Sequence, residues 1–193
     1  MAGLADVSGY VLVGGRSSRM GTDKALIIYH GQTLAGHIAS ELSTIAGTVS
    51  LVGDPGRYAG LGYTVVRDEY PGAGPTGGLV TALRASRTRW NLVAACDLPE
   101  VSAAFFGLLL NRIRSLDVRA VIPVTPDGRR QVLCAAYRSD ACAVLGRAFE
   151  SGETKLQAAI SQLDADYWRI ESDKLSVNLN TPEDWNVFMR QEA

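Results

Sequence analysis

A glycine-rich, cationic segment, LVGGRSSRMGTDKAL at residues 12–26, directly follows a short apolar run, Gly9–Val13, that is typical of a buried strand. Glycine has no Cβ, so the backbone N–H groups beside it can approach an anion closely. Arg16, Arg19 and Lys24 add three positive charges to the same loop. This combination predicts a fold in which the first strand of a sheet runs into a loop that holds a triphosphate.

Two commoner phosphate loops do not match this segment. A Walker loop has four residues between its glycines and then Lys-Ser or Lys-Thr, whereas here five residues separate Gly15 from Gly21. A dinucleotide fingerprint has the pattern Gly-x-Gly-x-x-Gly, which Gly14-Gly15-Arg16 breaks at its second glycine. The remaining alternative is a plain strand-to-helix turn, but such connections take two to six residues and need no cluster of cations.

Along the rest of the chain, short apolar runs bounded by Gly, Pro or Asp alternate with segments whose apolar residues recur every three or four positions. We expect strands at 9–13, 48–52, 64–67, 91–95, 120–123 and 133–137. We expect helices at 34–45, around 79–83, and at 103–114, 140–151, 155–163 and from 181 onwards. This alternation predicts an α/β fold with a doubly wound, mostly parallel sheet and helices on both faces.

Three details refine this prediction. The turn Pro126-Asp127-Gly128 joins two expected strands in a hairpin-like way, so the sheet should be mixed, with at least one antiparallel strand. Thr33 and Ser102 are expected to cap the helices that follow them. In the last helix, Pro182 would occupy the first position, and Trp185, Phe188 and Met189 are expected to face the core.

Bulk composition excludes several classes of protein. The net charge is −1, so no global field favours nucleic acid or an anionic membrane as a partner. No run approaches the ~20 apolar residues of a membrane span, and the N-terminus does not resemble a secretory signal. Cys96, Cys134 and Cys142 are odd in number and lack metal-site spacing, so we expect reduced thiols in a cytoplasmic protein.

Two further loops should meet the first one, because the carboxyl ends of parallel strands share one edge of a sheet. Residues 67–78 contain four glycines and two prolines, a rigid surface against which a base could lie, and Asp68 could accept hydrogen bonds from a ligand. Asp97 ends the apolar run 91–95 and suits Mg²⁺, which favours one or two carboxylates plus phosphate oxygens. The alternatives are that Asp68 is a turn residue and that Asp97 only caps a turn before Pro99.

Together, a cationic glycine loop, a base-sized platform and a metal carboxylate are what nucleotidyl transfer requires. Here the sequence resembles a known family. LVGGRSSRMGTDKAL is similar to the signature loop of the nucleotidyltransferases that act on sugars and cofactors, and most similar to that of the molybdenum cofactor guanylyltransferases. RDEYPGAGPTGG, AACDLP and VNLNTPED resemble later segments of that family in the same order.

The resemblance implies a single Rossmann-like nucleotidyltransferase domain over 1–193, with a nucleotide-binding half at 1–100 and an acceptor-binding half at 101–193. It implies transfer of GMP from Mg-GTP to molybdopterin or Mo-molybdopterin, with release of pyrophosphate. Cofactor-biosynthesis proteins or molybdoenzyme chaperones are implied as further partners. The implied reaction centre is Arg19, Lys24 and Asp97, with Asp97 as the ligand of Mg²⁺.

The implied nucleotide contacts are Leu12, Val13, Gly14, Gly15, Lys24, Asp68 and Asp97. The candidate acceptor contacts are Arg129, Arg130, Lys155, Asn178 and Asn180, although Arg129, Arg130 and Lys155 could equally be ordinary solvated charges. The chain departs from the family at two places. Val132 stands where a proline is frequent, and Val52-Gly53 stands where some members carry an asparagine that binds GTP.

Two alternatives remain. A cytidylyltransferase for molybdopterin, or for a sugar or isoprenoid phosphate, would share the loop chemistry. Its first loop tends to have Ala-Gly or Ala-Ala where this chain has Gly14-Gly15, which favours guanine. A non-catalytic nucleotide-binding adaptor of a molybdoenzyme chaperone is a different class, and the presence of Lys24 and Asp97 argues against it.

Overall fold

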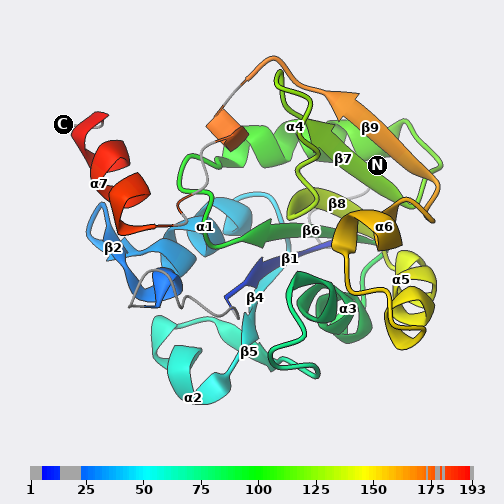
Figure 1. Cartoon of the computed structure of the whole chain (residues 1–193), viewed down its shortest axis with the longest axis horizontal. Coiled ribbons are helices and arrows are strands. Elements are labelled where there is room, and N and C mark those ends of the chain that lie inside the picture. The colour runs from blue at the N-terminus through cyan, green and yellow to red at the C-terminus, as the bar shows by residue number, and fades with distance from the viewer. Residues whose placement is uncertain (1–5, 14–22, 173, 177–178, 180, 192–193) are drawn as a thin grey trace.

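The fold is seen in a computed structural model that describes residues 6–13, 23–172, 174–176, 179 and 181–191. Its centre is a seven-stranded sheet in the order β5-β4-β1-β6-β8-β7-β9 (Figure 1). The strands are β1 (Val7–Leu12), β4 (Thr48–Gly53), β5 (Thr64–Arg67), β6 (Trp90–Ala95), β7 (Ala120–Val124), β8 (Cys134–Arg138) and β9 (Ala165–Arg169). β8 is antiparallel to both of its neighbours, and the other pairings are parallel. The doubly wound, mixed α/β sheet expected from the sequence is therefore confirmed.

Two parts of the sheet region were not expected from the sequence. β9 is a half-exposed edge strand with an Asp166-Tyr167-Trp168-Arg169 run, so it lacks the apolar run that marked the other strands. It pairs in parallel with β7. A separate hairpin joins β2 (Ile28–Tyr29) to β3 (Gln32–Thr33), and its turn has positive φ at His30 (48°) and Gly31 (80°). Positive φ at both central residues is the geometry of the tightest hairpin turns.

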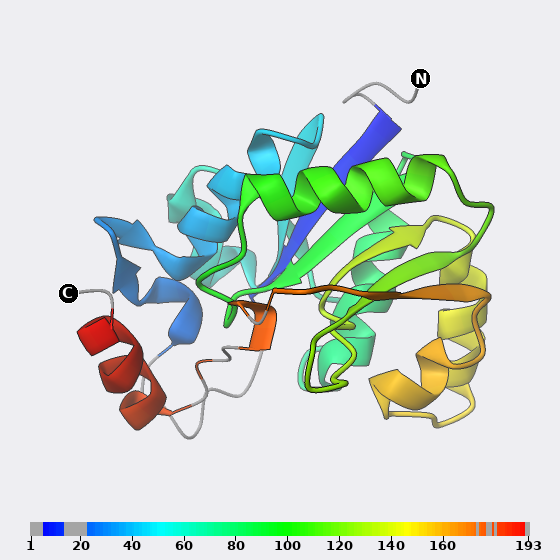
Figure 2. The same cartoon turned by 90° about the horizontal axis from the view of Figure 1, so that it is seen from above.

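Helices cover both faces of the sheet, as Figure 2 shows from above. On one face, α1 (Leu34–Ser43) and α4 (Ala103–Arg114) pack on Val11, Leu92 and other inward side chains of the central strands. On the other face, α3 (Pro75–Ala85), α5 (Ala141–Glu150) and α6 (Leu156–Ile160) pack on alternate residues of the same strands. β1 and β6 are buried along their whole length, because both of their faces are covered.

Side-chain caps fix where α1 and α4 begin. Thr33 Oγ1 accepts a hydrogen bond from Gly36 N at 3.1 Å, and Ser102 Oγ accepts one from Phe105 N at 3.3 Å, as expected from the sequence. Glu41, on α1, accepts a 2.6 Å hydrogen bond from Ala103 N at the first turn of α4. The two helices on this face are thereby tied to each other. None of the described helices is both long and apolar enough to cross a bilayer.

The last helix, α7 (Pro182–Gln191), lies beside the β2–β3 hairpin (Figure 1). A small apolar cluster holds it there, formed by Tyr29, Leu34, Leu179 and Phe188. Phe188 is buried and Trp185 is half-buried against this cluster, but Met189 is 37% exposed. The prediction that Met189 faces the core was wrong, because the helix packs on a narrow hairpin that covers only one stripe of its surface.

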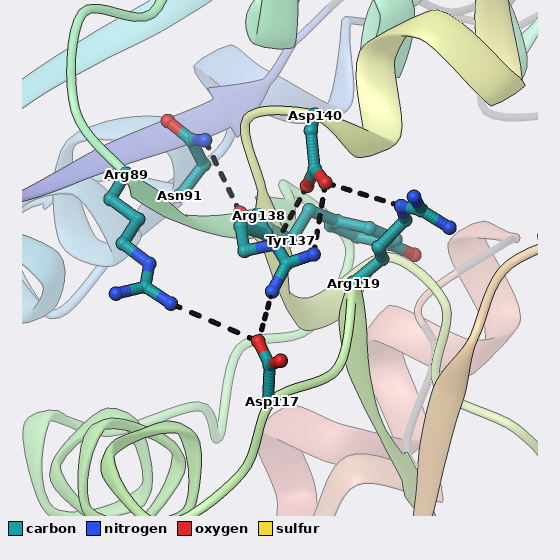
Figure 3. Close-up of polar contacts among 7 residues, drawn as sticks. All are labelled: Arg89, Asn91, Asp117, Arg119, Tyr137, Arg138 and Asp140. Carbon is teal, nitrogen blue, oxygen red and sulfur yellow. Dashed lines mark hydrogen bonds and ion pairs between the residues drawn. The ribbon is translucent and has the colours of Figure 1, made fainter.

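A network of charged side chains lies where β6 and β7 begin and β8 ends (Figure 3). Arg138, at the end of β8, holds both oxygens of Asp140 at 2.7 and 2.9 Å and Asp117 Oδ1 at 2.6 Å. Arg119 Nε lies 3.2 Å from Asp140 Oδ2. These hydrogen bonds lower the pKa of the Asp140 carboxyl below its ordinary value of 3.8, and the bond from Arg138 has the largest effect. Paired, bidentate contacts of this kind are stronger than single ion pairs.

We predict that Asp140→Asn lowers the free energy of unfolding at pH 7 by roughly 0.5–1 kcal/mol, because the pair is partly exposed and screened by solvent. Since the folded-state pKa of Asp140 is depressed, its contribution is full above the ordinary value of 3.8 and is lost as pH falls through the folded value. Urea unfolding at pH 7 and near pH 3 measures this. The difference from wild type should shrink in acid, and Glu171→Gln, an exposed carboxylate, should show no difference at either pH.

Candidate active site

The carboxyl ends of β1 and β6 lie side by side at the centre of the sheet, with Leu12 paired to Ala95. From β1 the chain crosses through α1 to β4 on one side, and the chain from β5 returns through α3 to β6 on the other. The connections thus diverge between these two strands. In open α/β sheets a crevice for ligands forms at such a point. Strands β1, β5 and β6 all end at this side of the sheet, and the segments that follow them were all singled out from the sequence.

Lys24 and Asp97 are brought together at this edge. Lys24 begins the short 3₁₀ helix η2 (Lys24–Leu26), and Asp97 follows β6. Burial raises the pKa of the half-buried Asp97 carboxyl above its ordinary value, and the nearby Lys24 ammonium opposes that rise without cancelling it. Burial also raises the pKa of the adjacent Cys96 thiol to about 12, with Asp97 and Asp23 adding to the shift. At neutral pH the Cys96 thiol is therefore neutral.

Asp23 holds this corner through three contacts that the sequence did not predict. Its Oδ1 accepts a hydrogen bond from Ala25 N at 3.1 Å and so caps η2. Its Oδ2 lies 2.8 Å from the hydroxyl of Tyr58 and 2.6 Å from Arg57 Nη2. Both partners come from the four-residue helix α2 (Pro55–Tyr58). The only sequence signal was the position of Asp23 as a possible N-cap before an apolar turn.

Gly53, at the end of β4, allows the Tyr58 ring to lie where it does. A Cβ at this position would come within 2.8 Å of Val13 Cγ2 and 2.9 Å of Tyr58 Cε2. Real Cβ atoms do not approach other atoms so closely, so a larger residue would displace one of these side chains. This accounts for the glycine at position 53 of this chain.

The loop after β5 is rigid at its start. Asp68 Oδ1 accepts hydrogen bonds from Tyr70 N at 3.0 Å and from Thr81 Oγ1 at 3.2 Å. This is the turn role considered for Asp68 as an alternative, and it occupies one carboxylate oxygen. Among the described residues, the second oxygen of Asp68 makes no hydrogen bond. Arg84, on α3, contacts both Glu69 and the Tyr70 hydroxyl and so fixes the loop to the helix behind it.

Leu12 and Val13, both predicted nucleotide contacts, lie at the end of β1. Their side chains are buried on opposite faces of the sheet. Leu12 O accepts a hydrogen bond from Cys96 N at 3.4 Å, Val13 N donates to Val52 O at 3.1 Å, and Val13 O accepts one from the Tyr58 hydroxyl at 2.8 Å. These contacts fix the backbone at the end of β1. Gly14, Gly15 and Arg19 lie outside the described residues and stay predictions.

A segment from the far end of the chain also reaches this edge. Leu179 is buried, and its N–H donates a 3.1 Å hydrogen bond to the carbonyl oxygen of Asp97. Asn178 and Asn180 flank this residue in the sequence but lie outside the described residues, so their predicted roles remain untested. The contact brings Leu179 to the backbone of Asp97.

The acceptor candidates divide into two groups. Arg129 and Arg130 line a surface hollow of about 380 Å³ together with Gly128, Gln131 and Gln157. Arg129 Nε lies 2.6 Å from Asp127 Oδ2, and Arg130 Cζ lies 4.4 Å from the centre of the Tyr167 ring. Lys155 is an exposed N-cap residue of α6 and does not line the hollow.

This hollow opens on the same edge of the sheet as Asp97. β8 runs antiparallel to β6, so the loop that leads into β8 meets the carboxyl end of β6, and Ala95 N donates to Leu133 O at 2.7 Å. Arg129 and Arg130 are thus on the correct side of the molecule for a role in the site.

Comparison with known proteins decides the family. A family model described as the MobA-like NTP transferase domain matches residues 9–166. The chain belongs to this family. A relative named probable molybdenum cofactor guanylyltransferase, from Chloroflexus aggregans, is 32% identical to this MobA-like NTP transferase over 189 residues, which cover 92% of this chain and 91% of the relative.

Solved structures agree on the fold of this MobA-like NTP transferase. Molybdopterin-guanine dinucleotide biosynthesis protein A from Archaeoglobus fulgidus superposes with a TM-score of 0.81 at 24% identity, covering 96% of this chain and 100% of that one. A 4-diphosphocytidyl-2C-methyl-D-erythritol synthase from Anaerococcus prevotii gives a TM-score of 0.70 at 12% identity, covering 97% and 99%. Proteins whose names refer to guanine and to cytidyl compounds thus share the fold, which by itself does not select the base.

We predict that Gly53→Ala destabilises this MobA-like NTP transferase by about 1–3 kcal/mol, the usual cost of forcing an extra methyl group into a packed site. Gly60→Ala is the matched control, because a Cβ there meets nothing within 4 Å. It should be neutral or slightly stabilising. Urea unfolding curves of both variants measure the difference, and equal stabilities would contradict the close packing described around Tyr58.

Proposed function

We propose that this protein transfers GMP from GTP to the terminal phosphate of molybdopterin and releases pyrophosphate. The observation that carries the proposal is the Lys24–Asp97 pair at the joined ends of β1 and β6, where burial and Lys24 act in opposite directions on the Asp97 pKa. The family and the Chloroflexus relative, whose name refers to a guanylyltransferase, support the choice of substrates. Its expected location is the cytoplasm, where the free thiols of Cys96, Cys134 and Cys142 would stay reduced.

The chemistry of Asp97 fits a divalent cation. Its carboxylate is partly desolvated, so a cation would compensate for the unfavourable burial of its charge. Within the described residues, no three His, Cys, Asp or Glu side chains gather as a metal cage. That agrees with Mg²⁺, which usually takes one or two protein carboxylates and completes its shell with phosphate oxygens and water. When bound, Mg²⁺ would neutralise charge on the phosphates that Asp97 brings it to.

In the proposed reaction an oxygen of the acceptor phosphate forms a bond to the α-phosphorus of GTP. The bond between the α- and β-phosphates breaks, and pyrophosphate carries away the electron pair. The Lys24 ammonium is proposed to neutralise charge on the phosphates, and Arg19 is proposed to do the same from the loop. The second oxygen of Asp68 would accept a hydrogen bond from the nucleotide, and Leu12 and Val13 would line the nucleotide site.

For the acceptor, we propose that the hollow beside Arg129 and Arg130 receives the phosphate end of molybdopterin, with Asn178, Asn180 and Lys155 as further candidate contacts. Arg129 is already paired with Asp127, and the hydrogen bonds of Thr125 and Arg129 lower the pKa of that carboxyl to about 2. Arg129 would therefore have to release Asp127 in order to bind a phosphate. Among the described residues Arg130 contacts the Tyr167 ring and no carboxylate, so it could bind a phosphate without first breaking an ion pair.

A cytidylyltransferase is the second candidate, because the fold is shared with a protein named for a cytidyl compound. We predict that GTP with Mg²⁺, but not CTP or ATP, raises the melting temperature. A ligand present at 100 times its Kd adds about 2.7 kcal/mol to the free energy of unfolding. Melting curves with the three nucleotides measure this. Stabilisation by CTP alone would favour the cytidylyltransferase instead.

We predict that Asp97→Asn cuts the transfer rate at least ~100-fold without unfolding the protein, the scale expected for one charge-stabilising group. Lys24→Ala should weaken triphosphate binding as well. The measurement is transfer of label from GTP, radioactive at its α-phosphate, onto purified molybdopterin. Asp117→Asn is the matched control, because Asp117 is an exposed carboxylate at the opposite end of the strands, just before β7. A wild-type protein that binds GTP but transfers no label would instead support a binding adaptor.

A further inference from the structure

One hydroxyl group joins the two ends of the nucleotide loop. The chain enters the loop at Val13 and leaves it at Asp23, the last described residue before it and the first after it. The Tyr58 hydroxyl lies 2.8 Å from Val13 O and 2.8 Å from Asp23 Oδ2. Its single proton is thus shared between two acceptors, one on each end.

The surroundings keep this hydroxyl in its donor role. Tyr58 is 2% exposed, so water does not compete for its proton. Burial, followed by the hydrogen bond to Asp23 and the charge of that carboxylate, raises the pKa of Tyr58 well above its ordinary value of 10.0. The hydroxyl therefore stays protonated at any physiological pH. Arg57 Nη2, 2.6 Å from Asp23 Oδ2, balances the carboxylate charge.

The ring is fixed independently of the hydroxyl. Tyr58 ends helix α2, whose start is capped by Asp54, with Oδ1 accepting from Gly56 N at 2.9 Å. One edge of the ring lies against Gly53, where a Cβ would be only 2.9 Å away. The hydroxyl is therefore presented to the loop ends from a preformed position, and its bonds do not have to hold the ring itself in place.

We propose that Tyr58 is a positioning residue for the nucleotide: by joining Val13 to Asp23 it fixes Lys24, the next residue, opposite Asp97. This inference rests on the proposed function, since it assumes that the loop binds a nucleoside triphosphate. It adds a residue from outside the loop and its motifs. Misplacing a binding group by about 1 Å is enough to lose most of its contribution, so the loss should appear in nucleotide affinity.

The test compares Tyr58→Phe with wild type, because the variant removes the hydroxyl and keeps the ring. We expect the Kd and the KM for Mg-GTP to rise about tenfold or more, as for a lost hydrogen bond to a charged group, with the KM for the acceptor unchanged. Tyr137→Phe is the matched control, since it too removes a buried hydroxyl that donates to a carbonyl, Val132 O at 2.6 Å. It should lose comparable stability and keep its affinity for GTP.

A second variant guards against a loss caused by folding alone. Asp23→Ala breaks the same junction, so adding Tyr58→Phe to it should weaken GTP binding less than threefold further. Independent, multiplying effects in the double variant would overturn the inference, and so would GTP affinity in Tyr58→Phe equal to that of the Tyr137→Phe control.

The same binding assay separates this inference from the proposed function. Wild-type protein that binds Mg-CTP in preference to Mg-GTP would refute guanylyl transfer, and the Tyr58→Phe comparison would then be made with Mg-CTP, with the same expected loss. Wild-type protein that binds none of the triphosphates would overturn both.

Discussion

The site depends on the parallel pairing of β1 with β4 on one side and β6 on the other. β1 is buried on both faces by two helical layers, so its register with β6 is set along its whole length by apolar packing. That register aligns Leu12 with Ala95 and so brings the two loops that follow, with Lys24 and Asp97, to the same point. The geometry of the site is thus a result of core packing, because the packing sets how far apart the ends of β1 and β6 lie.

Around that point, the two carboxylates Asp23 and Asp97 are both partly buried but differ in their partners. Burial raises the pKa of the Asp97 carboxyl, and the charge of Lys24 partly offsets this rise. Asp23 is the opposite case, a carboxylate whose two oxygens are fully engaged by Ala25 N, Tyr58 and Arg57. The two aspartates near Lys24, Asp23 and Asp97, are therefore in different environments. One has its hydrogen-bonding capacity taken up by the protein, whereas the other has a desolvated carboxylate that suits a cation.

Much of this could be predicted from the sequence, for identifiable reasons. β1 and β6 are short apolar runs that end in chemically unusual loops, and Thr33 and Ser102 are strong cap residues, so the elements and the edge carrying the site could be predicted. β9 could not, because an edge strand with one face half-exposed has no apolar run. Nor could the Tyr58–Asp23 contact, since the two residues are 35 positions apart and meet only because residue 53 is a glycine. The exposed position of Met189 follows from tertiary packing, which helical periodicity alone does not reveal.

The hydrogen bond from Leu179 to the carbonyl of Asp97 has a consequence for synthesis on the ribosome. Strands β1, β4 and β5 are translated early, and β1 can pair with β6 as soon as β6 emerges. The support beneath the Asp97 peptide group comes from a residue made 82 positions later, as 179 minus 97 gives. A growing chain can thus possess its central sheet while this backbone carbonyl still faces water. The finished geometry around Asp97 becomes available only after residue 179 has left the ribosome, which delays the assembly of the site relative to that of the central sheet.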